Sequence, residues 1–220
     1  GKIYASGPKY GLRQNIPLAY MWLSIGRING SKAAKKSFLL NNLNLLNKAK
    51  YCIAQGQANV GVMYSKGLAG LPKDGEKAME WLQRANETDP NLAGIQLNLS
   101  KFYYAGIGTE QDTALAFHYA KKAAKQPFGP AQQYLAQFYF NGVATKCDLV
   151  KAYAWLLKAK YTYEHPDTKF YSQYIPHCRP SYEGDALQNA KTAQAQMDAI
   201  RPHLTSAELS KAIELEKTLK

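Results

Sequence analysis

Histidine and cysteine are the residues of this sequence best suited to catalysis or metal binding, and both are scarce. The four histidines are His118, His165, His177 and His203, and the three cysteines are Cys52, Cys147 and Cys178. His177 and Cys178 are adjacent, and an imidazole beside a thiol could supply a base and a nucleophile, or two metal ligands. Neighbouring residues point in different directions, however, and no second ligand pair stands at a usable spacing. We therefore expect no catalytic residue, no metal site and no cofactor, with a cryptic enzyme around His177 and Cys178 as an alternative.

Known catalytic motifs and targeting segments are missing from the sequence as well. It contains no GxSxG, HExxH or P-loop pattern, and Gly106-Ile-Gly108 is a lone GxG. The odd number and wide spacing of the cysteines do not form a disulfide framework. They therefore do not indicate whether the protein works in an oxidising or a reducing compartment. We expect no transmembrane segment, because no run of 18 apolar residues occurs. The chain begins with Gly1 and without a signal peptide, as a mature form or an excised piece would.

The charge of the chain is strongly basic. Its 220 residues carry 28 Lys+Arg against 16 Asp+Glu, a net charge of +12, while 46% of the residues are hydrophobic. This apolar content excludes a disordered chain. The lysines cluster at Lys32/Lys35/Lys36, Lys48/Lys50, Lys121/Lys122/Lys125 and Lys158/Lys160. Solvated helix faces usually carry such lysines, and a phosphate contact is the alternative. Arginine, which binds phosphate and guanine with two parallel hydrogen bonds, is scarce, so we do not expect nucleic acid as a partner.

The elements that would position any site are repeats. Tyr-x-x-Gly occurs four times, and each copy is followed by a four-residue motif that begins with alanine and ends with Trp or Tyr. The four motifs are Ala19-Tyr-Met-Trp22, Ala78-Met-Glu-Trp81, Ala116-Phe-His-Tyr119 and Ala152-Tyr-Ala-Trp155. The last three are almost equally spaced, and the longer first interval indicates an insertion. Two anchors that recur together predict a repeat protein.

The spacing within one unit predicts a pair of helices. In the last unit Ala131, Leu135 and Tyr139 share one helix face, and Gly142 is placed to end that helix. Asp148 is placed to cap the second helix, as Asp112 and Asp74 are in the earlier units.

The second helix of that unit presents Ala152, Trp155 and Ala159 on one face. The small residues let the two helices approach, and the aromatic residue fills the space between neighbouring units. Such a unit cannot bury its own apolar face, so we expect the units to stack into a solenoid.

These residues resemble the Sel1-like repeat family, relatives of the tetratricopeptide repeats. The resemblance implies an all-α fold, a right-handed α/α solenoid closed by a C-terminal helical cap. The structural repeat positions that carry it are Tyr64, Gly67, Ala78, Trp81, Tyr103, Gly106, Ala116, Tyr119, Tyr139, Gly142, Ala152 and Trp155. The family's Gly-x-Gly loop is intact only at Gly106-Ile-Gly108, and Ala144 replaces its second glycine in the last unit.

The domain organisation follows from the repeats. We expect a partial repeat at 1–30, a helical insertion at 31–55 and three repeats at 56–160. Residues 161–220 combine an aromatic, proline-rich segment with a helical hairpin that caps the last repeat. Within that hairpin Thr205-Ser-Ala-Glu208 has the pattern of a capping box.

A partner would bind on the first helix of each unit, which lines the concave side in Sel1-like and related solenoids. Positions on these helices away from the core stripe should face the groove: Asn59, Lys66, Asn98, Lys101, Tyr134, Gln137 and Asn141. Their amide, ammonium and phenol groups suit hydrogen bonds to an extended peptide or a protein surface. The alternative for each is a merely solvated side chain.

The resemblance implies a function as well as a fold. It points to a non-enzymatic scaffold or adaptor that binds a partner protein or peptide in the concave groove. Lysine, asparagine and tyrosine richness suggests a bacterial protein, and the family's exported members favour a periplasmic or secreted setting, in envelope biogenesis or host interaction. The alternative is binding of a polyanion or cell-wall polymer through the lysine clusters.

Overall fold

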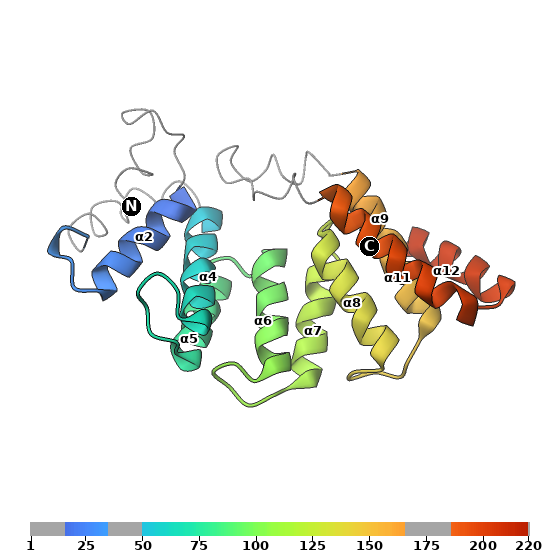
Figure 1. Ribbon diagram of the computed structural model, residues 1–220, viewed down its shortest axis with the longest axis horizontal. Coiled ribbons are helices and arrows are strands. Elements are labelled where there is room, and N and C mark those ends of the chain that lie inside the picture. Colours follow the sequence, from blue (N-terminus) through green and yellow to red (C-terminus); the bar gives the residue numbers. More distant parts are fainter. Residues whose placement is uncertain (1–15, 35–49, 166–185, 220) are drawn as a thin grey trace. The chain divides into compact units, whose positions relative to one another are not determined.

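The computed structural model describes residues 16–34, 50–165 and 186–219, and every regular element in these ranges is a helix (Figure 1). The helices are α2 (Ile16–Ile28), α4 (Lys50–Lys66), α5 (Gly75–Thr88), α6 (Ala93–Ala105), α7 (Thr113–Ala124), α8 (Gly129–Asn141), α9 (Leu149–Glu164), α11 (Ala186–Ile200), the 3-10 turn η2 (Arg201–His203) and α12 (Ser206–Thr218). The predicted all-α fold is confirmed for this part of the chain. None of the described helices combines the length and the apolar content that crossing a lipid bilayer requires.

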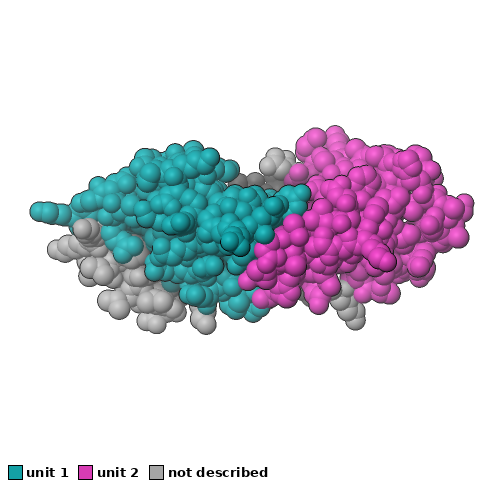
Figure 2. Space-filling model, turned by 90° about the horizontal axis from the view of Figure 1, so that it is seen from below, with its two compact units in different colours: residues 1–111, 171–179 teal, residues 112–170, 180–220 magenta. Residues whose placement is uncertain are grey.

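The chain divides into two compact units, coloured separately in Figure 2. Among the described residues, unit 1 holds α2, α4, α5 and α6 and ends at Gln111. Unit 2 begins at Asp112 and holds α7, α8, α9, α11 and α12.

Unit 1 is built around the close pair of α4 and α5. Asp74 caps α5 by accepting a hydrogen bond of 2.9 Å from the backbone N–H of Lys77, as its position predicts. Ala78 and Trp81 of α5 are buried against α4. A side chain at Gly61 of α4 would approach the Ala78 carbonyl oxygen to 2.8 Å. The small residues of the repeat therefore set how near the two helices come.

The Gly-x-Gly loop acts in packing between repeats of unit 1. Gly108 has a φ of +70°, and a Cβ built there would lie 1.9 Å from the carbonyl oxygen of Gly75, the first residue of α5. Elsewhere alanine adopts the same left-handed backbone, with φ of 58° at Ala69 and 55° at Ala144. Both alanines stand where the Gly-x-Gly loop has its second glycine. The replacement thus preserves the turn but introduces backbone strain.

Unit 2 repeats the pairing in α8 and α9 and adds the cap. Asp148 accepts a hydrogen bond of 2.9 Å from the Lys151 backbone and starts α9, whose Trp155 is buried. Helices α11 and α12 both pack on α9. The capping box of α12 is present, with the backbone N–H of Thr205 donating to the Glu208 carboxylate at 2.9 Å.

Some sequence predictions fall on residues outside those described. They include residues 1–15 of the partial first repeat, most of the predicted helical insertion, and the pair His177 and Cys178. The predicted boundaries between residues 30 and 31, 55 and 56, and 160 and 161 remain predictions.

The first repeat differs from the others at its tryptophan. Trp22 of α2 is 40% exposed, whereas Trp81 and Trp155 at the equivalent positions are 6% and 7% exposed. The repeat pattern predicted that this aromatic residue would fill the space between neighbouring units. The exposure of Trp22 shows that it does not fill a closed space.

Candidate protein-binding surface

The predicted groove residues of unit 1 lie on α4 and α6, two helices that contact each other. Lys66 and Lys101 are exposed, while Asn59 and Asn98 are partly buried. Asn59 accepts a hydrogen bond of 3.1 Å from the amide nitrogen of Gln55, one turn earlier in α4. Asn98 has no hydrogen bond to any described residue, so its amide is available to a ligand.

The charge of Lys66 acts on the ammonium group of Lys101. Desolvation lowers the pKa of the Lys101 ammonium, and the positive charge of Lys66 lowers it further. Two like charges on contacting helices repel, so an anionic group placed beside them would relieve the repulsion.

The predicted groove residues of unit 2 lie on α8. Gln137 and Asn141 are exposed and have no hydrogen bond within the described residues. Tyr134 is only partly exposed, because its ring packs edge-on against Phe138 at a centroid distance of 5.3 Å. The structure therefore gives Tyr134 a packing role in addition to its predicted place on the surface.

Acidic residues are absent from the first helix of each complete repeat. The first helices of the three complete repeats, α4, α6 and α8, contain no aspartate or glutamate, and α8 contains no charged residue. The acidic residues of the described helices lie mainly on α5 and α12, whereas α9 and α11 have one each and α7 has none. A surface that offers amides, aromatic rings and a few ammonium groups suits a neutral or acidic protein segment.

An apolar pocket of about 180 Å³ opens beside Gln137. It lies between α8 and α11, with α9 as the third wall, and is lined by Ala136, Gln137, Phe140, Leu156, Gln196, Ala199 and Ile200. Of these residues the sequence pointed only to Gln137. The α11 residues were missed because they lie outside the repeats, and no local signal relates them to α8.

A chain of hydrogen bonds spans α9, α8 and α11 in the same unit. The Tyr163 hydroxyl donates to Gln133 Oε1 at 3.0 Å, and Gln133 Nε2 donates to Gln196 Oε1 at 2.8 Å. These bonds orient the Gln196 side chain, whose Nε2 has no partner among the described residues.

A second feature missed from the sequence is a buried glutamine in each complete repeat. Gln57, Gln96 and Gln132 each stand seven residues before the repeat tyrosine, and at most 5% of each is exposed. A glutamine at a fixed place before the Tyr-x-x-Gly motif was the available signal.

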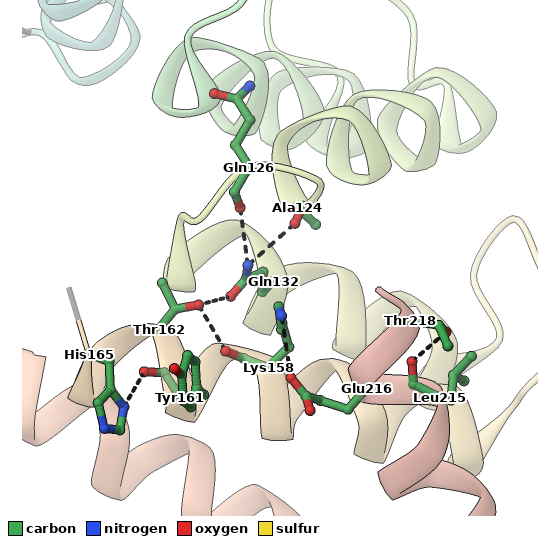
Figure 3. Close-up of polar contacts among 10 residues, drawn as sticks. All are labelled: Ala124, Gln126, Gln132, Lys158, Tyr161, Thr162, His165, Leu215, Glu216 and Thr218. Atoms are coloured by element: carbon green, nitrogen blue, oxygen red, sulfur yellow. Dashed lines mark hydrogen bonds and ion pairs between the residues drawn. The ribbon is translucent and has the colours of Figure 1, made fainter. Parts of the chain in front are cut away.

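Figure 3 shows the contacts of Gln132. Its Nε2 lies 3.1 Å from the Gln126 carbonyl and 3.4 Å from the Ala124 carbonyl, and its Oε1 accepts from the Thr162 hydroxyl at 2.8 Å. The side chain ties α8 to the end of α7 and to α9. Gln57 accepts from Thr88 of α5 in the corresponding way, at 2.8 Å. These glutamines are structural and are not available to a ligand.

The lysine clusters are partly neutralised within the chain. Lys158 lies 3.4 Å from the Glu216 carboxylate, and Lys160 lies 3.6 Å from that of Glu164. The Lys121 ammonium lies 5.6 Å from the centre of the Phe117 ring. Within the described ranges, no three His, Cys, Asp or Glu side chains gather as metal ligands would.

Helix pairs with a repeating Tyr-x-x-Gly and Ala-x-x-Trp pattern define the class of protein, an α-helical repeat protein. The Sel1 repeat matches residues 1–27, 54–87, 96–128 and 129–161, more than half of the chain. The chain therefore belongs to the Sel1 repeat family, which confirms the resemblance. Proteins of this family are generally non-catalytic scaffolds for protein–protein interaction.

Two solved structures show similarity to this chain. A Sel1 repeat protein from Oxalobacter formigenes is 27% identical, with a TM-score of 0.46, over 61% of this chain and 95% of its own. The protein c5321, a protective antigen present in uropathogenic Escherichia coli strains and displaying an SLR fold, is 18% identical with a TM-score of 0.42. That match covers 99% of this chain and 51% of c5321, so the chain spans about half its length. Comparison with curated proteins finds no match.

Proposed function

We propose that this chain is a non-enzymatic adaptor that binds a partner protein or peptide on the first helices of its repeats. The observation that carries the proposal is the absence of acidic residues from the first helices α4, α6 and α8. These helices keep exposed or accessible amides at Asn98, Gln137 and Asn141 that have no partner among the described residues. Amides of this kind hydrogen-bond to the backbone of a bound segment.

The setting we propose is the bacterial envelope or the interface with a host cell, in the periplasm or outside the cell. The composition supports it, because the chain is rich in lysine, asparagine and tyrosine.

The test is affinity capture from an extract of the native organism, followed by a binding titration with the captured partner. A triple variant with Lys66→Glu, Lys101→Glu and Asn98→Ala should weaken capture by at least about tenfold. The matched control is Lys122→Glu with Lys125→Glu, which makes the same charge change on the second helix of a repeat and just after it. Both variants should keep the thermal stability of the parent. Equal capture by all three proteins would refute the assignment of this surface.

Polyanion or cell-wall polymer binding is the second candidate. The specific observation in its favour is α7, which carries Lys121 and Lys122 in its last turn and no acidic residue. Salt separates the two functions, since polyanion affinity should fall steeply between about 50 and 200 mM salt. A protein partner held mainly by amides and apolar contacts should respond weakly to the same change. A steep loss for the Lys122→Glu, Lys125→Glu control would favour the polymer.

A further inference from the structure

In two of the three complete repeats, the aspartate that caps the second helix also holds a cation. The Lys77 ammonium lies 3.0 Å from the Asp74 carboxylate, and the Lys151 ammonium lies 2.9 Å from the Asp148 carboxylate. Each lysine stands three residues after its aspartate and donates its backbone N–H to the other carboxylate oxygen at 2.9 Å. The carboxylate therefore caps the helix with one oxygen and pairs with the ammonium through the other.

The ammonium groups of these lysines also lie over the tyrosine of the same repeat. Lys77 Nζ is 5.9 Å from the centre of the Tyr64 ring, and Lys151 Nζ is 5.4 Å from the centre of the Tyr139 ring. At these distances the face of the ring attracts the positive charge. The hydrogen bond to Asp148 raises the pKa of the Lys151 ammonium. The chain thus shows twice that this place in the repeat binds an ammonium group.

The third repeat has the same carboxylate without the lysine. Asp112 caps α7 in the same way, because it accepts a hydrogen bond of 2.8 Å from the backbone N–H of Leu115. Leucine thus takes the position of the lysine, and its side chain is 40% exposed. Asp112 has no ion pair with any described residue. Its second carboxylate oxygen is therefore left for a cation from outside the chain.

Charge and surface together decide which occupant fits this place. A carboxylate without a counter-charge attracts a cation and repels an anion. The ammonium groups at the two equivalent carboxylates stand on apolar four-carbon stems, and the exposed Leu115 offers such a stem an apolar surface beside Asp112. A metal ion would need further ligands, and no three candidate ligands gather within the described ranges. A lysine side chain fits both the charge and the apolar surface.

We propose that Asp112 binds a lysine side chain of a partner protein, with the ammonium group paired to the second carboxylate oxygen and the stem packed on Leu115. The inference rests on the proposed function and deepens it, because it names a residue type that the partner contributes. The site lies at the start of α7, a second helix, and so adds a contact that the first helices do not supply.

The experiment selects binders from a displayed library of random linear peptides on the whole chain and then titrates synthetic peptides that contain lysine. The repeats suggest the blocking variant, because Leu115→Lys supplies the ammonium that the other two repeats already have. Asp112→Asn removes the charge, and asparagine still caps a helix. The matched control is Asp148→Asn, since the carboxylate of Asp148 is already paired with Lys151. Circular dichroism checks that each variant keeps the helix content of the parent.

We expect one lysine of the bound peptide to engage Asp112. Its replacement by alanine should weaken binding to the parent about two- to fivefold, the range that an exposed ion pair supplies. Asp112→Asn and Leu115→Lys should each cause a similar loss with the lysine peptide. The alanine peptide should bind these two variants as it binds the parent, and Asp148→Asn should leave the affinity of both peptides unchanged.

Three results would overturn the inference. If the peptides bind Asp112→Asn and Leu115→Lys as tightly as the parent but lose binding to the Lys66, Lys101 and Asn98 variant, the proposed function stands and Asp112 is not part of its surface. If Asp148→Asn weakens binding as much as Asp112→Asn, net charge and not this site causes the loss. If neither library nor native extract yields a binder, the proposed function fails with it.

Discussion

Gln132 offers the sharpest test of how unit 2 is held together, because it is a polar residue with only 2% of its surface exposed. Replacing it with leucine keeps the approximate volume and removes every hydrogen bond of the amide. In the variant the Thr162 hydroxyl still donates a hydrogen bond to the Lys158 carbonyl at 2.9 Å. The Gln126 carbonyl still accepts one from the backbone N–H of Phe128 at 2.7 Å. The buried Ala124 carbonyl loses the donor that Gln132 supplies to it.

The cost of Gln132→Leu follows from these contacts. The hydrogen bonds to Thr162 and Gln126, whose groups keep another partner, are worth about 1 kcal/mol each. The third bond leaves the buried Ala124 carbonyl unsatisfied, which costs about 1–3 kcal/mol. The extra apolar burial of leucine offsets part of this, so we expect a net loss of about 2–3 kcal/mol. For a chain of this length the melting temperature should fall by roughly 4–12 °C.

Urea unfolding followed by circular dichroism measures the loss, with Gln137→Leu as the matched control. Gln137 is the same residue type on the same helix but is exposed, so its replacement should change stability by less than about 0.5 kcal/mol. A double-mutant cycle with Thr162→Val should give a coupling energy of roughly 0.5–3 kcal/mol. Equal stability of the two leucine variants, or zero coupling, would refute the reasoning.

Three further predictions concern the repeat loops, the helix caps and the lysine pair. Gly108→Ala should lower stability by about 1–3 kcal/mol in thermal unfolding, because the new Cβ would lie 1.9 Å from the Gly75 carbonyl oxygen; an unchanged melting temperature would contradict this packing. Asp148→Ala should cost about 1 kcal/mol at neutral pH. Burial raises the Asp148 pKa, but hydrogen bonds to it and a nearby ammonium outweigh burial and hold the pKa below its usual value. The contribution of Asp148 to stability should thus be complete above the ordinary pKa of 3.8 and vanish as pH falls through the folded-state value. A difference in urea midpoint between the parent and Asp148→Ala that persists in strong acid would argue against this. Lys66→Met should raise the pKa of Lys101 in an NMR titration of labelled lysines, since it removes a like charge, and an unmoved pKa would mean that the two ammonium groups do not interact.

Local features of the fold were predictable, because they depend on residues close in sequence. Asp74, Asp112 and Asp148 were each predicted to cap a helix, and each accepts a hydrogen bond from the backbone N–H three residues later. The glycines Gly106 and Gly142 end α6 and α8 in the left-handed conformation that the repeat pattern indicated. A side chain and a backbone group three or four positions apart meet whatever the rest of the chain does.

The candidate surface was predictable only in part. Helical spacing placed Gln137 and Asn141 on an exposed face of α8, but it also counted Tyr134, whose ring packs against Phe138. The pocket beside Gln137 needs Ala199 and Ile200, which lie beyond the repeats in α11. Spacing within one helix says nothing about which distant helix will lie against it.

The sequence alone determined the repeat, the helix ends and the family, because each depends on short motifs that recur along the chain. The tertiary structure decided what the glutamines of α8 do. Gln132 is enclosed between the end of α7 and α9, Gln133 bridges to α11, and Gln137 stays open to solvent. The three side chains are chemically identical, so burial and the positions of the surrounding helices give each its own role.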